Sequence, residues 1–147
     1  MSSESRSETR QERFDRGMRV LTEIDGQAGR RVVASLAGIS PELGHQMVAW
    51  GFGEIYARPE LAPRDRQLVT LGMLAALGGC EAQLEGHVDA ALNVGLTPVQ
   101  IVEALLHSAP YCGFPRAINA TIAAKRVFAQ RGLAPVGAEP GEDVDPM

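Results

Sequence analysis

The sequence LAPRDRQLVTLGMLAALGG occupies residues 61–79, and CEAQLEGHVDAALNVG follows it over residues 80–95. The first stretch is apolar almost all round at helical spacing, which predicts a buried helix beginning near Pro63. Two adjacent glycines, Gly78 and Gly79, break that helix. A second helix is then expected from about Cys80 until Gly95 supplies a C-terminal stop. This part of the chain therefore indicates helices and no strand.

The same helical spacing is found upstream. An apolar stripe over residues 14–24 stops near Gly26, and a short second helix is expected over residues 28–36. Ser40 can cap a further helix that has Pro41 at its first position and runs to about Ile55. These segments predict three helices before residue 60.

Two more helices are expected downstream. Thr97 and Gln100 form a capping box that opens a helix, which Pro110 should close. The last helix should run from about Pro115 to Gly132. The chain is thus predicted to be all-α, a single-domain bundle of six to seven helices.

Length and composition fit one globular domain. The chain has 147 residues, of which 45% are hydrophobic and 22% charged. We expect the domain to span residues 10–133, between a flexible polar N-terminus over residues 1–9 and a disordered acidic tail over residues 134–147. The net charge of -4 gives no attraction to nucleic acid. The absence of a long apolar run and of a signal-like segment predicts a cytoplasmic protein that does not enter membranes.

One face of the helix expected after residue 80 carries the strongest candidates for chemistry. Cys80, Gln83 and His87 are spaced three and four residues apart and so share a face. Histidine is the side chain best suited to transfer a proton near neutral pH, although a core histidine would show the same pattern. Near the positive end of the helix dipole, Cys80 would favour a thiolate; otherwise it is a small buried filler.

The remaining candidates are more scattered. Arg64 and Arg66 have the geometry to hold a carboxylate, although such arginines are more often solvated or form salt bridges. Glu103 stands four residues before a histidine, which allows a hydrogen-bonded pair or a weak surface pair. The phenol of Tyr111 lies at a bend and can donate a hydrogen bond. No metal-ligand spacing and no phosphate-binding loop is present, so neither a metal nor a cofactor is expected.

Taken in order, these elements resemble the carboxymuconolactone decarboxylase family. The resemblance rests on the basic helix start, the ALGG ending, His87 followed by Ala91 and Gly95, and the later residues Thr97, Pro98, Glu103, Tyr111, Gly113 and Pro115. It implies an alkylhydroperoxidase D-like helical subunit that assembles into homo-oligomers, either trimers or hexamers.

The resemblance also implies a reaction. Members either remove CO2 from a carboxylated lactone in aromatic-compound degradation or reduce peroxides through a C-x-x-C-x-x-x-H motif. Gln83 replaces the second cysteine of that motif, which favours the decarboxylase branch. The implied catalytic residues are His87, Tyr111, Glu103 and Cys80, and the implied substrate-binding residues are Arg64, Arg66 and Gln83.

Other functions stay open. Gln67 and Gln83 stand where related members often carry acids, so the chain is also compatible with recruitment to another small-molecule step, for example in biosynthesis. A peroxide reductase that depends on Cys80, with or without Cys112, is a second alternative. A non-catalytic oligomeric binder is the third.

Overall fold

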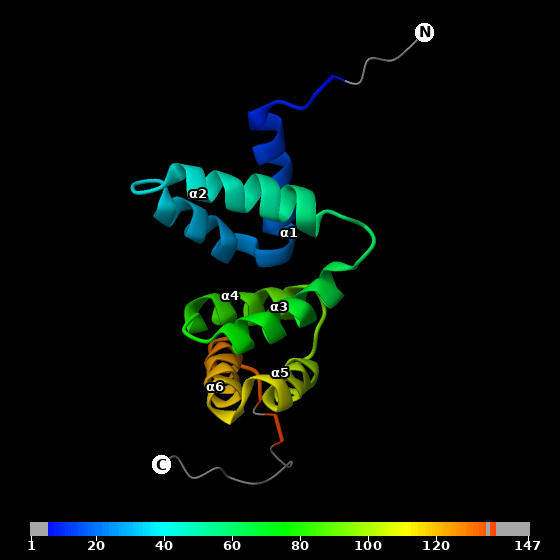
Figure 1. Ribbon diagram of the computed structural model, residues 1–147, viewed down its shortest axis with the longest axis vertical. Coiled ribbons are helices and arrows are strands. Elements are labelled where there is room, and N and C mark those ends of the chain that lie inside the picture. Colours follow the sequence, from blue (N-terminus) through cyan, green and yellow to red (C-terminus); the bar gives the residue numbers. More distant parts are fainter. Residues whose placement is uncertain (1–5, 135, 138–147) are drawn as a thin grey trace. The chain divides into compact units, whose positions relative to one another are not determined.

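The computed structural model describes residues 6–134 and 136–137, and within these the chain forms helices and connections without any strand (Figure 1). The all-α class is confirmed. The expectations for residues 1–5 and 138–147 fall outside the described residues. None of the described helices is long and apolar enough to cross a membrane. The elements in order are α1 Arg10–Leu36, α2 Pro41–Gln46, η1 Met47–Tyr56, α3 Pro63–Leu77, α4 Glu81–Asn93, α5 Pro98–Cys112 and α6 Phe114–Gln130.

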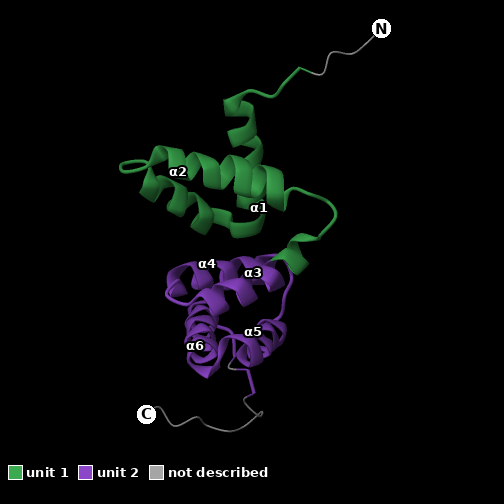
Figure 2. Ribbon diagram, viewed as in Figure 1, with its two compact units in different colours: residues 1–66 green, residues 67–147 purple. Residues whose placement is uncertain are grey.

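The chain folds into two compact units, residues 1–66 and residues 67–147 (Figure 2). The boundary falls in the first turn of α3. Each unit has helices that pack against one another, and each is described by itself below.

Unit 1 contains α1, α2 and η1. The expected break in the first helix is present, because Gly26 has φ 58° and ψ -140° inside α1. The Ser40 side chain accepts a hydrogen bond from the backbone N–H of Leu43, which confirms the expected cap of α2. A capping box at Thr9 and Glu12, which the sequence analysis did not identify, starts α1.

The helix that starts at Pro41 changes its winding at Met47. From there to Tyr56 it is a π-helix, η1, where an α-helix was expected. Its last hydrogen bond joins the backbone N–H of Ala57 to the carbonyl of Phe52, five residues back. The side of η1 that is buried consists of Val48, Ala49, Phe52 and Gly53.

Unit 2 contains nearly all of α3 together with α4, α5 and α6. Its hydrophobic core draws on all four helices. Salt bridges join α4 to Arg126 on α6 and to Arg131, the C-cap residue of α6: Arg126–Glu85 at 2.6 Å and Arg131–Asp89 at 2.7 Å. The capping box at Thr97 and Gln100 is present as expected. The core residues are Leu71, Ala75, Leu84, Val88, Ala91, Leu96, Ile101, Leu105, Ala120, Ala123, Ala124, Val127 and Phe128.

Two expectations about unit 2 were wrong. The helix α3 is not buried all round: Val69, Met73 and Leu77 are 48%, 61% and 68% exposed, because only one side of α3 packs into the core. The helix α5 does not close at Pro110 but continues to Cys112. A proline in the last turn removes only one backbone donor, and the next bond, from the N–H of Gly113 to the carbonyl of Ala109, is intact at 2.9 Å.

The closest approach in unit 1 lies between α1 and η1 and generates a stability prediction. A Cβ atom at Gly17 would stand 2.1 Å from the carbonyl oxygen of Val48, so backbone would have to move. We expect Gly17→Ala to lower the free energy of unfolding by about 1–3 kcal/mol, the usual cost of overpacking. Gly51→Ala is the matched control, because a Cβ there meets nothing within 4 Å. Urea unfolding of both variants checks this, and a Gly17→Ala protein as stable as wild type would contradict it.

Candidate active site

The candidate site in unit 2 is centred on His87, which lies in α4 and is partly buried. Its helix neighbours Leu84, Val88 and Ala91 are at most 2% exposed, so the ring adjoins the core as the sequence indicated. Across the helix pair, the ring nitrogen Nδ1 is 3.1 Å from the side-chain oxygen Oε1 of Gln67 in α3. This is normal hydrogen-bond geometry between two side chains that are 20 residues apart in sequence.

The hydrogen bond with Gln67 defines how His87 holds its proton. An amide oxygen can only accept, so Nδ1 must be the donor. Nε2 then presents a lone pair. Burial lowers the pKa of His87 below its ordinary value of 6.5, because removal from water disfavours the charged ring. Near pH 7 the resting ring is therefore neutral, with Nε2 able to accept a proton.

Gln67 is the residue of this site that the sequence analysis did not select. Its side chain is 0% exposed, and its amide nitrogen Nε2 has no hydrogen-bond partner. The sequence does carry a signal for its burial: residues 67, 71 and 75 stand on one stripe of α3, and the other two, Leu71 and Ala75, are core residues. Gln67 is the polar residue of this buried stripe, and its side-chain oxygen is the hydrogen-bond partner of His87.

The other two candidates from this part of the chain, Cys80 and Gln83, take no part in the hydrogen bond between His87 and Gln67. Gln83 is exposed. Cys80 is the N-cap residue of α4, one position before its first turn, and its thiol donates to the carbonyl of Leu74 at 3.3 Å. A cavity of about 10 Å³ adjoins Cys80, bounded also by Arg116, and has room for about one water molecule. Both Cys80 and Cys112 are free thiols.

The two arginines at the start of α3 differ from each other. The guanidinium of Arg66 donates to the backbone carbonyls of Leu61 at 3.0 Å and of Arg58 at 3.2 Å, so it holds the loop before α3. Arg64 is partly buried and forms no side-chain hydrogen bond or ion pair within the described chain. Of the two, Arg64 has the guanidinium available for a ligand.

Tyr111 and Glu103 are both exposed residues of α5. Tyr111 is 81% exposed, and its ring lies 5.5 Å from that of His107. The hydrogen-bonded pair that the spacing allowed between Glu103 and His107 does not form in the described structure; the contact of His107 is with Tyr111 instead. No hydrogen bond or ring contact joins either residue to His87.

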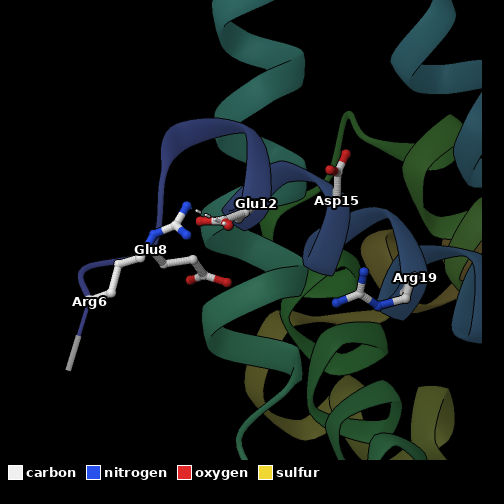
Figure 3. A pocket seen from close by; sticks show the side chains of 5 residues that line it. All are labelled: Arg6, Glu8, Glu12, Asp15 and Arg19. Carbon is white, nitrogen blue, oxygen red and sulfur yellow. Dashed lines mark hydrogen bonds and ion pairs between the residues drawn. The ribbon is translucent and has the colours of Figure 1, made fainter. Parts of the chain in front are cut away.

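Charged hollows lie along α1 in unit 1, and two of them are defined by their lining residues. The first lies between Arg6, Glu8, Glu12, Asp15 and Arg19 (Figure 3). Opposite charges compensate each other there, as in the 3.3 Å salt bridge between Arg6 and Glu12. The second hollow adds Met18, Thr22, Glu23 and Arg30 to Asp15 and Arg19. Neither contains a histidine or a thiol, so the candidate chemistry rests with His87.

The described residues contain no group of three or more histidine, cysteine, aspartate or glutamate side chains that could hold a metal ion. The side chains of the site supply a proton acceptor at Nε2 of His87, the amide of Gln67 beside it and apolar neighbours on α4.

Comparison of the sequence with known proteins identifies the family of this helical protein. The profile of the Carboxymuconolactone decarboxylase family matches residues 41–126, more than half of the chain. The protein belongs to this family, and the resemblance seen in the sequence is confirmed.

Two curated relatives indicate the class of enzyme within this family. The chain is 32% identical to the 4-carboxymuconolactone decarboxylase of Acinetobacter baylyi over 126 residues, which cover 85% of this chain and 93% of the relative. It is 34% identical to nitrosuccinic acid decarboxylase npaB of Metarhizium robertsii over 134 residues, 87% of this chain and 90% of the relative. Both are named decarboxylases, which confirms the expected class of carboxy-lyase.

The lowered pKa of His87 predicts how stability depends on pH. Because the folded pKa lies below the ordinary value of 6.5, the unfolded chain binds more protons between the two values. This contribution to stability is complete above about pH 6.5 and is lost as the pH falls through the folded pKa. We expect His87→Gln to lose less stability than wild type between pH 7.5 and pH 5, by about 1.4 kcal/mol for each unit of pKa depression. Urea unfolding at both pH values measures this, and parallel losses in the two proteins would contradict it.

Proposed function

We propose that this protein removes CO2 from a carboxylated lactone in the degradation of aromatic compounds, with His87 supplying the proton that replaces the carboxylate. The observation that carries this proposal is the partly buried, neutral His87 whose Nδ1 is held by Gln67 and whose Nε2 is left as the reacting atom. The relative named 4-carboxymuconolactone decarboxylase, similar over 93% of its length, supports the substrate class.

The proposed reaction breaks one C–C bond and forms one C–H bond. As CO2 leaves, the electron pair of the broken bond moves into the conjugated lactone carbonyl. The resulting enolate then takes a proton at carbon from Nε2 of the imidazolium form of His87. One proton from solvent is consumed for each CO2 released. A lowered pKa makes the imidazolium a stronger acid and so a better donor to carbon.

Other residues would assist at the two ends of the substrate. Arg64 would hold a carboxylate, because its guanidinium has no partner in the described chain, and Arg66 would support the loop before it. Tyr111 would donate to the developing oxyanion. Gln83 and Glu103 lie on exposed faces of α4 and α5. In an oligomer, Gln83 would bind the substrate and Glu103 would act in catalysis at a site that a partner subunit completes.

A second candidate is a family member that has been recruited to another carboxylate. The relative named nitrosuccinic acid decarboxylase favours it, because a nitro group, like a conjugated carbonyl, can accept the electron pair left by CO2. The same His87 would then protonate the carbon next to that group. The two candidates differ in substrate and share the reaction.

We further propose that the protein acts in the cytoplasm as a homo-oligomer, a trimer or a hexamer. Exposed apolar stripes support association. On α6, Phe114, Ile118 and Ile122 are 74%, 53% and 48% exposed and stand four residues apart, on one face.

The first test is turnover of enzymatically generated 4-carboxymuconolactone, followed by ultraviolet absorbance. We expect wild-type protein to form the decarboxylated enol-lactone and His87→Ala to do so about 10²- to 10⁴-fold more slowly, the usual contribution of a general acid. Circular dichroism and size-exclusion chromatography show whether the variant keeps its fold.

Three outcomes have distinct meanings. Full turnover by folded His87→Ala would remove His87 from the mechanism. No turnover by wild type, together with decarboxylation of nitrosuccinate, would favour the second candidate. Consumption of peroxide by wild type that Cys80→Ser abolishes, together with loss of free thiol after peroxide, would favour a thiol reductase.

The two arginines give a separate prediction. Arg64→Met should raise KM for the carboxylate substrate by about tenfold to a hundredfold, the effect of losing a charge-assisted hydrogen bond, and leave the Tm close to wild type. Arg66→Met should instead lower the Tm, because the carbonyls of Arg58 and Leu61 lose their donor. Steady-state kinetics and thermal unfolding of both variants measure the split. The reverse pattern would assign substrate binding to Arg66.

A further inference from the structure

We propose that Gln67 is a positioning residue that makes a proton enter the site together with the substrate. It keeps the proton of resting His87 on Nδ1 and, being uncharged, leaves the charge of the imidazolium to be balanced by the carboxylate of the substrate. The inference rests on the decarboxylation proposed above and names the part of that site that couples binding to proton uptake.

The first support is the geometry of the pair. Oε1 of Gln67 lies 3.1 Å from Nδ1, and an oxygen there is compatible only with a proton on Nδ1. The opposite orientation of the amide would place an N–H against Nδ1 and require the proton on Nε2. The orientation of the Gln67 amide therefore fixes the tautomer of the His87 ring, and a measurement of the tautomer reports the orientation of the amide.

The second support is the lack of a countercharge at His87. No acid hydrogen-bonds to its ring, and the pKa shift has burial as its cause, without a charged neighbour. Two acids of α4 that flank His87 in sequence, Glu85 and Asp89, are engaged in salt bridges with Arg126 and Arg131. The other charged or titratable groups on the helices of unit 2 include Glu81 on α4, Glu103 and His107 on α5, and Arg116 and Lys125 on α6; the first turn of α3, which belongs to unit 1, carries Arg64, Asp65 and Arg66.

The third support is the state of the amide itself. The Gln67 side chain is fully buried, yet its Nε2 has no hydrogen-bond partner in the described structure. A buried N–H donor without an acceptor is unfavourable, and it favours an anion nearby over a cation. A glutamate at this position would fill the same volume but would neutralise the imidazolium before any substrate arrived.

The proton balance follows from these points. Resting His87 is neutral, and the carboxylate of the substrate arrives as an anion. A proton from solvent adds to Nε2 as the anion binds, which forms an imidazolium–carboxylate pair. The C–C bond then breaks, its electron pair enters the electron-accepting group, CO2 leaves, and Nε2–H protonates the carbon. His87 returns to its neutral form with the proton still on Nδ1.

The first arm of the test reads the tautomer by ¹⁵N NMR of histidine-labelled protein without any ligand. We expect wild-type His87 to carry its proton on Nδ1. Gln67→Met, which keeps the volume but not the hydrogen bond, should show a mixture of tautomers. Gln67→Glu should raise the pKa of His87, since a carboxylate then faces Nδ1. Wild-type protein with its proton on Nε2, or variants that match wild type, would overturn the proposal.

The second arm measures proton uptake by calorimetry in buffers of different ionisation enthalpy. The probe is 5-oxotetrahydrofuran-2-carboxylate, a saturated lactone carboxylate that lacks the conjugated carbonyl needed to accept the electron pair. We expect uptake of about one proton per bound probe above the pKa of His87, and about tenfold weaker binding for each further pH unit. In Gln67→Glu the uptake should vanish and binding should weaken about tenfold or more, because two carboxylates then compete for one imidazolium.

Controls separate this proposal from the proposed function. Gln100→Glu adds the same charge at an exposed capping-box position that accepts glutamate, and should match wild type in both arms. The methyl ester of the probe should bind without proton uptake. Probe binding without proton uptake in wild type would overturn the role of Gln67 and leave the decarboxylase proposal standing. Failure of wild type to bind the probe, with no turnover in the ultraviolet assay, would overturn both.

Discussion

The reversal of the chain at Gly78 and Gly79 is the constraint on which the rest of unit 2 depends. Both residues have positive φ, 66° and 72°, a backbone conformation that side chains other than glycine rarely adopt. Two such residues in succession end α3 and return the chain as α4. Core packing and the bond between Gln67 and His87 both require that return. The turn therefore sets the site as well as the fold.

The protonation state of His87 depends on the lack of an acidic hydrogen-bond partner for its ring. Burial favours the neutral form of a histidine, and a neighbouring acid would instead stabilise its cation. Here the neighbour is an amide, and the acids of α4 at positions 85 and 89 are paired with arginines of α6. The ring therefore stays neutral, and its hydrogen bond to Gln67 keeps the proton on Nδ1. In the proposed reaction, the carboxylate of the substrate supplies the negative charge that balances the imidazolium.

The sequence predicted most of the helices because their ends carry strong local signals. Ser40, the capping box at Thr97 and the glycine pair act within a few residues, and the structure agrees with each. The π-helical winding of η1 and the exposed stripe of α3 depend on packing between distant segments, which periodicity does not encode. For the same reason His87 was selected on its chemistry, whereas Gln67 was noted only as standing in place of an acid, and its hydrogen bond to His87 was not predicted.

The salt bridges between α6 and α4 also bear on the order in which the protein can form during synthesis. The side chains that they join are 41 and 42 residues apart, and α6 supplies the final part of the core. A ribosome therefore exposes α3 and α4, with their apolar faces open, well before the helix that covers them has been made. Unit 1 has a similar wait, because Arg16 on α1 donates a hydrogen bond to the carbonyl of Gly53 in η1, 37 residues further along the chain. Each unit therefore exposes apolar helix faces during synthesis until its last helix has been made, and exposed faces of this kind favour aggregation.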